Sequence, residues 1–288
     1  MILSQSRLWF AALGAAAILG TAATARAQDT DATRKKFTLN VPEVANTISS
    51  GTFFRGAPGT NSGTPLAFGP NWRDAFVGGG YQNQTRGFKQ PNGSISANNT
   101  NDGSVSAGFG LGDNREAVGV EVAITSLSTF RSGFGNRTAF SFKVHRMLGN
   151  TAAVAVGVEN AFIAGGQKTD GTDSWYGVVS KVFVLPGTES GFFKAFTMSG
   201  GIGNGRFRFL DDVVKNKQTV NVFGSASMLL HNKVSAIVDY TGQDLNLGLS
   251  LVPFHGFPMV ITPTLADVTG TASKTPRFEL GVGIGMHF

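Results

Sequence analysis

The chain contains no cysteine, few charged residues and, after its first 27 residues, no long uninterrupted apolar run. Without cysteine it has no disulfides, no thiolate metal site and no catalytic thiol. Charged residues make up 15% of the sequence, well below the roughly one quarter that is usual in soluble domains. No later stretch approaches the roughly 20 apolar residues of a membrane-spanning helix. The basic side chains are scattered, so nucleic acid is not an expected partner.

Apolar residues and glycine are abundant in the same chain. Apolar residues make up 41% of the sequence, which contains 39 glycines and 24 phenylalanines. Such a chain buries too much apolar surface to remain disordered, yet has too few charges for an ordinary soluble surface. A closed β-barrel resolves the conflict, because it pairs all its backbone groups between strands and turns apolar side chains toward lipid.

The N-terminal residues have the pattern of an export signal. Arg7 precedes an apolar stretch over residues 8–20, and Ala25 and Ala27 form an A-x-A cleavage site. We therefore predict a cleaved signal peptide at residues 1–27 rather than a membrane helix, for which the stretch is too short. Residues 28–71, rich in Gly, Ser, Thr and Pro toward their end, are expected to be a periplasmic leader. They form either an exposed tail or, in part, a plug inside the barrel.

Residues 72–288 show repeated alternation of apolar and small or polar side chains. The last eleven residues place six apolar side chains on one face and Glu279, three glycines and His287 on the other. Successive side chains of a strand point to opposite faces, so each such segment predicts a strand with one apolar face. The sequence predicts twelve strands, near residues 74–86, 103–111, 118–125, 140–145, 154–159, 175–185, 193–203, 219–229, 233–240, 245–251, 259–268 and 278–288.

The connections between these strands alternate in length. Even-numbered connections are short, and odd-numbered ones are mostly longer, apart from residues 241–243. Short turns at one end and long loops at the other are typical of bacterial barrels with an even strand count. The sequence therefore predicts an all-β fold, a transmembrane antiparallel up-and-down β-barrel of about 12 strands.

With its export signal, its alternation and a final strand that ends in phenylalanine, the chain resembles bacterial outer-membrane β-barrel proteins. The resemblance implies a location in the outer membrane of a Gram-negative-type bacterium, surrounded by its lipid. It also implies that the barrel-assembly machinery and periplasmic chaperones read the last strand. The implied insertion signal consists of Leu280, Val282, Ile284, Met286 and Phe288.

Charged side chains within the predicted strands indicate which face is the lumen. A charge on the lipid face near the middle of the bilayer costs about 2–4 kcal/mol, more than differences in strand propensity. The expected orientation of Lys181 is the weakest, because Val179 and Phe183 share its row. The side chains expected to face the lumen are those of Glu121, Lys143, His145, Glu159, Lys181, Asp239 and Glu279.

The function that fits these features is a passive, porin-like channel for small solutes, not an enzyme. A non-conducting structural or surface-interaction barrel and a barrel-embedded lipid hydrolase are the alternatives. The hydrolase would use Ser141 and His145, four residues apart on one strand face, but no motif supports this pair. We expect no catalytic residue, no metal and no cofactor, because the histidines lack metal-ligand spacing and the Gly-x-Gly segments are not followed by a helix.

Overall fold

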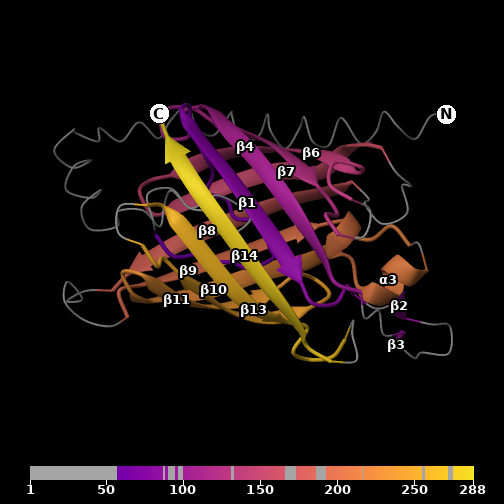
Figure 1. Cartoon of the computed structure of the whole chain (residues 1–288). Coiled ribbons are helices and arrows are strands. Elements are labelled where there is room, and N and C mark those ends of the chain that lie inside the picture. Colours follow the sequence, from indigo (N-terminus) through magenta and orange to yellow (C-terminus); the bar gives the residue numbers. More distant parts are fainter. Residues whose placement is uncertain are drawn as a thin grey trace. The chain divides into compact units, whose positions relative to one another are not determined.

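Twelve strands form one closed antiparallel barrel, in which each strand pairs with its neighbours along the chain (Figure 1). In this computed structural model the last strand returns to the first, and their pairing runs from Asp74 opposite His287 to Gln82 opposite Glu279. The predicted all-β, up-and-down barrel of about 12 strands is confirmed. No helix of the described part of the chain is long and apolar enough to cross a membrane.

The structure describes residues 57–86, 88–89, 95–96, 100–130, 133–165, 173–185, 193–215, 217–254, 257–271 and 275–288. These residues belong to one compact unit, Glu43–Phe288. The predicted signal peptide at residues 1–27 and the leader up to residue 56 lie outside the described residues.

The barrel strands follow the predicted segments closely. They are β1 (Asp74–Gln82), β4 (Asp102–Gly112), β5 (Gly119–Ser126), β6 (Thr138–Leu148), β7 (Ala152–Ala164), β8 (Ser174–Val184), β9 (Ala195–Gly203), β10 (Asn221–His231), β11 (Val234–Tyr240), β12 (Leu245–Leu251), β13 (Met259–Ala266) and β14 (Arg277–His287). Two short strands, β2 (Phe88–Lys89) and β3 (Ile95–Ser96), pair with each other between β1 and β4. The β9–β10 connection contains a 3₁₀ turn, η2 (Gly205–Phe207), and a short helix, α3 (Leu210–Val214).

Strand direction defines two ends of the barrel. We call the end where β1 begins and β14 finishes the proximal end, and the opposite end the distal end. Because the strands alternate in direction, β11 runs from proximal to distal, and β6, β8 and β12 run the other way. The β9–β10 connection is therefore distal, and the β4–β5 connection is proximal.

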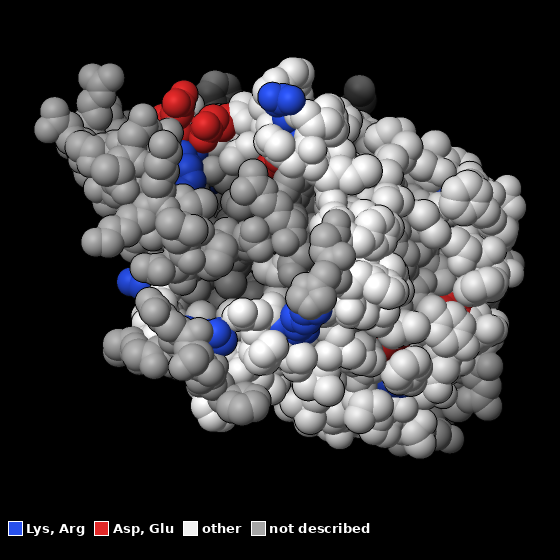
Figure 2. Space-filling model, turned by 60° about the vertical axis from the view of Figure 1, so that its left-hand side comes forward, with Lys and Arg blue, Asp and Glu red and all other residues white. Residues whose placement is uncertain are grey.

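Every barrel strand exposes at least one large apolar side chain on its outer face. This outer row includes Val77, Phe109, Ile124, Val144, Phe162, Val179, Ile202, Val222, Val238, Leu247, Leu265 and Val282. Few charged atoms interrupt the described surface in the view of Figure 2. Apolar side chains at alternate positions of every strand are what a lipid-facing wall requires.

Lys181 lies on this outer face, contrary to the prediction that it faces the lumen. It is exposed in β8, in the same row as Val179 and Phe183, and its Nζ lies 5.3 Å from the centre of the Phe183 ring. Lys181 is three residues from the proximal end of β8, so its long aliphatic stem can carry the ammonium to the membrane surface. A lysine near a strand end is therefore compatible with the lipid-facing row.

Candidate functional site in the barrel lumen

Residues 57–71, which we call the luminal segment, lie inside the barrel. The backbone N–H of Gly59 donates to Ser250 Oγ of β12 over 2.7 Å, and Lys143 Nζ of β6 donates to the Phe68 carbonyl over 2.8 Å. Five strands separate β6 from β12 on either side, so these contacts reach opposite walls. Leu66, Ala67 and Phe68 have no exposed surface. The luminal segment therefore crosses the lumen and fills much of it.

The luminal segment forms a loop whose two ends both lie at the proximal end. Gly59 also accepts a hydrogen bond from Ser235, near the proximal start of β11. Thr64 contacts Asp239, near the distal end of the same strand. The segment then returns toward the proximal end, where Asn71 hydrogen-bonds Asn114 in the β4–β5 connection.

Asp239 holds the distal tip of this loop. The backbone N–H groups of Ser62, Gly63 and Thr64 donate to its Oδ2 over 3.0, 3.1 and 3.2 Å, and the Thr64 hydroxyl donates to the same oxygen over 3.0 Å. The Asp239 side chain is fully buried. Successive backbone N–H groups that converge on one carboxylate form a concave anion-binding arrangement. A single inward-facing side chain thus fixes three consecutive residues of the luminal segment.

Two adjacent inward residues of β6 hold the returning arm. Lys143 Nζ forms a salt bridge of 2.5 Å with Glu121 Oε2, and the two residues are cross-strand neighbours between β5 and β6. The side chains of Lys143 and Glu121 are 2% and 6% exposed, so this ion pair is shielded from solvent. His145 Nε2 lies 3.1 Å from the Pro70 carbonyl oxygen. Both β6 side chains therefore bind backbone carbonyls of the luminal segment.

His145 does not pair with Ser141. Its Nδ1 lies 3.2 Å from the Asn114 amide nitrogen, and its Nε2 contacts the Pro70 carbonyl. This pattern fits a neutral imidazole with its proton on Nε2, because the amide nitrogen donates and the carbonyl accepts. The Ser141 hydroxyl oxygen instead accepts the backbone N–H of Asn160 over 3.1 Å. The two residues named for a hydrolase are therefore occupied by other partners.

The β9–β10 connection reaches the tip of the luminal segment from the distal end. Arg206 of η2 donates through Nη2 to Glu159 Oε1 over 2.8 Å and through Nη1 to the Gly63 carbonyl over 2.9 Å. The neighbouring Phe207 is fully buried and stacks on Phe223 with 4.3 Å between ring centres. This connection and the luminal segment therefore contact each other within the distal half.

A second charged cluster lies at the distal mouth, around Asp244 of the β11–β12 turn. Asp244 Oδ2 accepts from Arg86 over 2.5 Å and from Arg277 over 2.8 Å, and Arg277 also contacts Glu279 Oε1 over 3.2 Å. Burial alone would raise the pKa of Asp244, but the two arginines outweigh it and lower this pKa below its ordinary value. Asp244 therefore remains ionised, and its negative charge partly compensates the positive charges of Arg86 and Arg277.

Gly110 provides the clearest steric test of how the luminal segment meets the wall. A Cβ atom added to Gly110 of β4 would lie 2.3 Å from the Pro70 carbonyl oxygen and 2.4 Å from that of Asn71. We expect Gly110→Ala to lower the free energy of unfolding by about 1–3 kcal/mol, the usual range for overpacking. Gly200→Ala is the matched control, because its Cβ would meet nothing within 4 Å. Denaturant unfolding in detergent micelles compares the two, and equal losses would contradict this contact.

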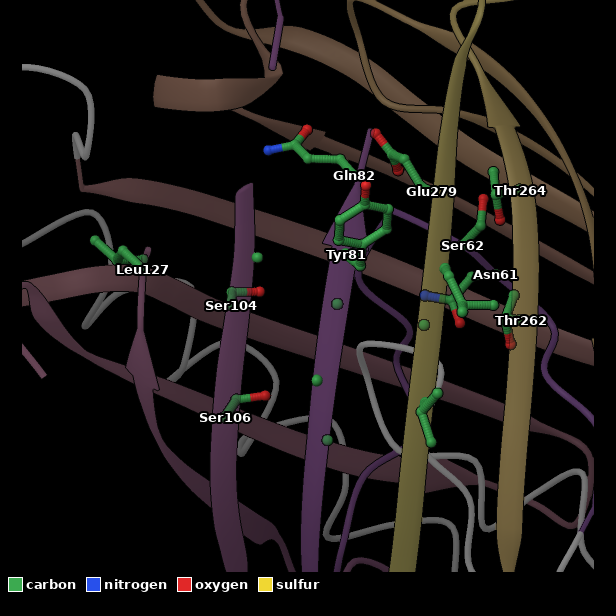
Figure 3. A pocket seen from close by; sticks show the side chains of 17 residues that line it. Asn61, Ser62, Tyr81, Gln82, Ser104, Ser106, Leu127, Thr262, Thr264 and Glu279 are labelled. Atoms are coloured by element: carbon green, nitrogen blue, oxygen red, sulfur yellow. The ribbon is translucent and has the colours of Figure 1, made fainter. Parts of the chain in front are cut away.

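A cavity of about 320 Å³ remains between the luminal segment and the wall formed by β4, β1, β14 and β13. Gly80 of β1 is paired with Gly281 of β14, and Gly78 with Gly283, so four inward positions of this seam have no side chain. The cavity exists because these glycines leave the space in front of the seam empty. Figure 3 shows side chains that line it, among them Asn61, Ser62, Gln82, Ser104, Ser106, Thr262, Thr264 and Glu279.

The structure thus gives a position for each residue that the sequence singled out. Inward-facing are Glu121, Lys143, His145, Glu159, Asp239 and Glu279, whereas Lys181 faces outward. Leu280, Val282, Ile284 and Met286 form the outer row of β14, and Phe288 follows it with 65% exposure. Within the described residues, no three His, Asp or Glu side chains are grouped so that they hold a metal ion.

Comparison with known proteins gives no assignment from sequence. No protein-family model matches the chain, and no curated protein matches it. An outer membrane channel from Pseudomonas putida F1 aligns with a TM-score of 0.44 and 11% identity, over 75% of this chain and 95% of that one. Ail, the attachment invasion locus protein of Yersinia pestis, aligns with a TM-score of 0.20 and 11% identity, over 75% of this chain and 98% of Ail.

The fold is identified by the closed barrel, with its apolar outer wall and polar lumen. The chain has the fold of bacterial outer-membrane β-barrel proteins. This is the resemblance that the sequence predicted. The parts that distinguish this barrel from an empty cylinder are the luminal segment and the cavity beside the β1–β14 seam.

Proposed function

We propose that this outer-membrane barrel is a passive channel for small polar solutes, closed at rest by its own luminal segment. The observation that carries the proposal is the content of the lumen. A polar inner wall encloses a 320 Å³ cavity and a segment of backbone attached mainly through hydrogen bonds. Side chains alone just fill the interior of a barrel of about eight strands, so a twelve-stranded barrel leaves room for a passage when the luminal segment moves.

The luminal segment is built so that it can leave without opening the barrel wall. The strand pairing that closes the barrel involves β1, which begins at Asp74 and pairs with β14 on one side and with β4 on the other. The luminal segment ends before β1 and adds no strand to this pairing. Its movement would therefore exchange hydrogen bonds with a few inward side chains for hydrogen bonds with water, while the backbone pairing of the wall stays intact.

On the proximal side of the cavity, buried aromatic side chains occupy the lumen. Phe76 of β1 is 2% exposed and points inward, and Phe68 of the luminal segment is fully buried. A Cβ at Gly108 of β4 would lie 2.6 Å from the Phe76 ring. Solute passage therefore requires the arm of the luminal segment near Phe68 to move away from this half of the lumen.

The experiment that tests the function is conductance of the refolded mature protein in a planar lipid bilayer. We expect stepwise openings in the wild type, and several-fold smaller steps for Gly281→Phe, whose ring would enter the cavity. The Cβ itself fits, because the nearest atoms lie 3.8 Å away on Thr262. Ile284→Phe is the matched control, since Ile284 belongs to the outer row of β14 and does not line the cavity, so the same ring would point into lipid.

Equal conductance of the two variants would contradict a passage along the β1–β14 seam. Absence of steps from the wild type and also from a variant without the luminal segment would contradict the channel function itself. In that case a non-conducting structural or surface-interaction barrel would be the better account. Migration of unheated and boiled samples in a gel verifies that each variant forms a barrel before the conductance is compared.

The proposal also covers how the protein reaches its site. The outer row of β14 and the exposed Phe288 at its end are available for recognition before the strand meets lipid. We infer that the barrel-assembly machinery and periplasmic chaperones recognise this row, and that outer-membrane lipid surrounds the finished wall. The proposed function assigns no catalytic residue and needs no cofactor.

A further inference from the structure

Hydroxyl, amide and carboxylate groups make up most of the side chains that line the cavity beside the β1–β14 seam, where they lie next to Leu127, Leu280 and Val282. Hydroxyl and amide groups point into it from three elements, including Ser104 and Ser106 of β4, Thr262 and Thr264 of β13, and Asn61 of the luminal segment (Figure 3). Such groups both donate and accept hydrogen bonds and can replace part of the hydration shell of a solute. The lining therefore suits a small hydrated or hydroxylated solute rather than an apolar one.

Glu279 gives this polar lining a negative charge. Among the described residues that line the cavity, it alone carries a formal charge. Its side chain is 29% exposed, whereas the side chain of its neighbour Arg277 is 3% exposed and does not line the cavity. Oε1 of Glu279 contacts Arg277 over 3.2 Å, and Oε2 has no hydrogen-bond partner among the described residues. One carboxylate oxygen is thus left available to the cavity.

The positive charge of Arg277 is directed away from the cavity. Its Nη2 donates to Asp244 over 2.8 Å, a shorter contact than the 3.2 Å to Glu279. Asp244 also binds Arg86, so the cluster of two arginines and two carboxylates is balanced overall. Within it the buried members are Asp244 and Arg277, and the member exposed to the cavity is the carboxylate of Glu279. The formal charge that faces the cavity is therefore the negative charge of Glu279.

We propose that the cavity is a binding site for small cations and that Glu279 determines the cation preference of the channel. This inference rests on the proposed channel function and names the class of solute that it favours. A cation in the cavity would replace water ligands with Oε2 of Glu279 and neighbouring hydroxyl oxygens. An anion would meet the same carboxylate, because the positive group beside it, the guanidinium of Arg277, is buried and does not line the cavity. Solutes with an ammonium group and small metal cations share this chemistry.

The test is the reversal potential in a KCl gradient, measured in bilayers that hold many copies of the full mature chain. We expect the wild type to prefer K⁺ over Cl⁻. In Glu279→Gln the permeability ratio should fall roughly tenfold, because one unit charge across about 6 Å of water changes the permeability of each ion about threefold, in opposite directions for K⁺ and Cl⁻. Glu279→Asp should retain the preference, because it keeps the charge. Glu116→Gln is the matched control, since Glu116 is exposed in the β4–β5 connection outside the cavity.

Each outcome bears on the inference. A conducting Glu279→Gln variant with an unchanged permeability ratio would overturn it, while the channel function would stand. A fall of the ratio in Glu116→Gln equal to that in Glu279→Gln would also overturn it, because the effect would then be one of general surface charge. Should Glu279→Gln fail to form a barrel, Ser106→Lys places a positive charge in the lining on β4, which is separated from Glu279 of β14 by β1 alone. That variant should lower the ratio as well, and an unchanged ratio there would overturn the inference.

Discussion

Removing residues 28–68 from the mature protein should raise its single-channel conductance several-fold in a planar bilayer. The residues that fill the lumen between opposite walls are then absent, whereas β1 still begins at Asp74 and still pairs with β14. Barrel diameter grows with strand number, and a twelve-stranded wall leaves room for an aqueous passage once it is emptied. Detergent-resistant migration of the unheated variant verifies that the barrel has closed. A conductance equal to that of the wild type would contradict the role of the luminal segment.

A milder variant separates the position of the luminal segment from its presence. Asp239→Ala removes the acceptor for three backbone N–H groups and one hydroxyl of residues 62–64. A hydrogen bond to a charged group contributes about 1.5–3 kcal/mol, so the closed arrangement should lose much of its advantage. We expect a higher open probability with the luminal segment still present. Asp173→Ala, an exposed carboxylate next to β8, should leave the open probability unchanged.

The strands are predictable from sequence because the membrane imposes a strict pattern on them. Every second side chain of β12, Leu245–Leu251, is a leucine, and the outer row of β14 is equally regular. A polar side chain in the lipid-facing row is costly near the middle of the bilayer, so apolar residues recur at every second position along each strand. The twelve predicted segments therefore coincide with the twelve barrel strands, with ends that differ by a few residues.

The luminal segment follows no such pattern, and the sequence left open whether residues 28–71 form a tail or a plug. Its order comes from single hydrogen bonds to distant residues, such as Gly59 to Ser250, 191 positions away. Nothing in a polar, glycine-rich stretch indicates these partners. A related signal was visible, however, in the inward carboxylate of Asp239, which the sequence placed in the lumen without a partner. A buried carboxylate requires hydrogen-bond donors, and the luminal segment supplies them.

Three charged residues were missed or misplaced, two of them in connections and one in a strand. Arg206 and Asp244 lie in connections, where no periodicity gives a direction, yet both point into the lumen and hold other elements. Lys181 was placed inward because a charge on the lipid face is costly. That cost depends on depth and is small near the ends of strands, where Lys181 lies. The apolar neighbours in its row were the better guide.

The buried ion pair of Lys143 and Glu121 gives the second large effect. Lys143→Met should lower the free energy of unfolding by about 3–5 kcal/mol, because it leaves the charge of Glu121 buried without its partner. The loss also includes the hydrogen bond from Nζ to the Phe68 carbonyl, which holds the returning arm of the luminal segment. The measurement is denaturant unfolding of the barrel in detergent micelles.

The same substitution on the other face of the wall is the control. Lys181→Met replaces a lysine that faces outward from β8, so it should change stability by less than about 1 kcal/mol or increase it slightly. The double variant Lys143→Met with Glu121→Gln should recover most of the loss, since no charge is then left unpaired. Equal losses for Lys143→Met and Lys181→Met would mean that the face of the wall does not matter. If the double variant is no more stable than Lys143→Met, the loss of stability comes from the missing hydrogen bond to the luminal segment. The unpaired charge of Glu121 would then not be its cause.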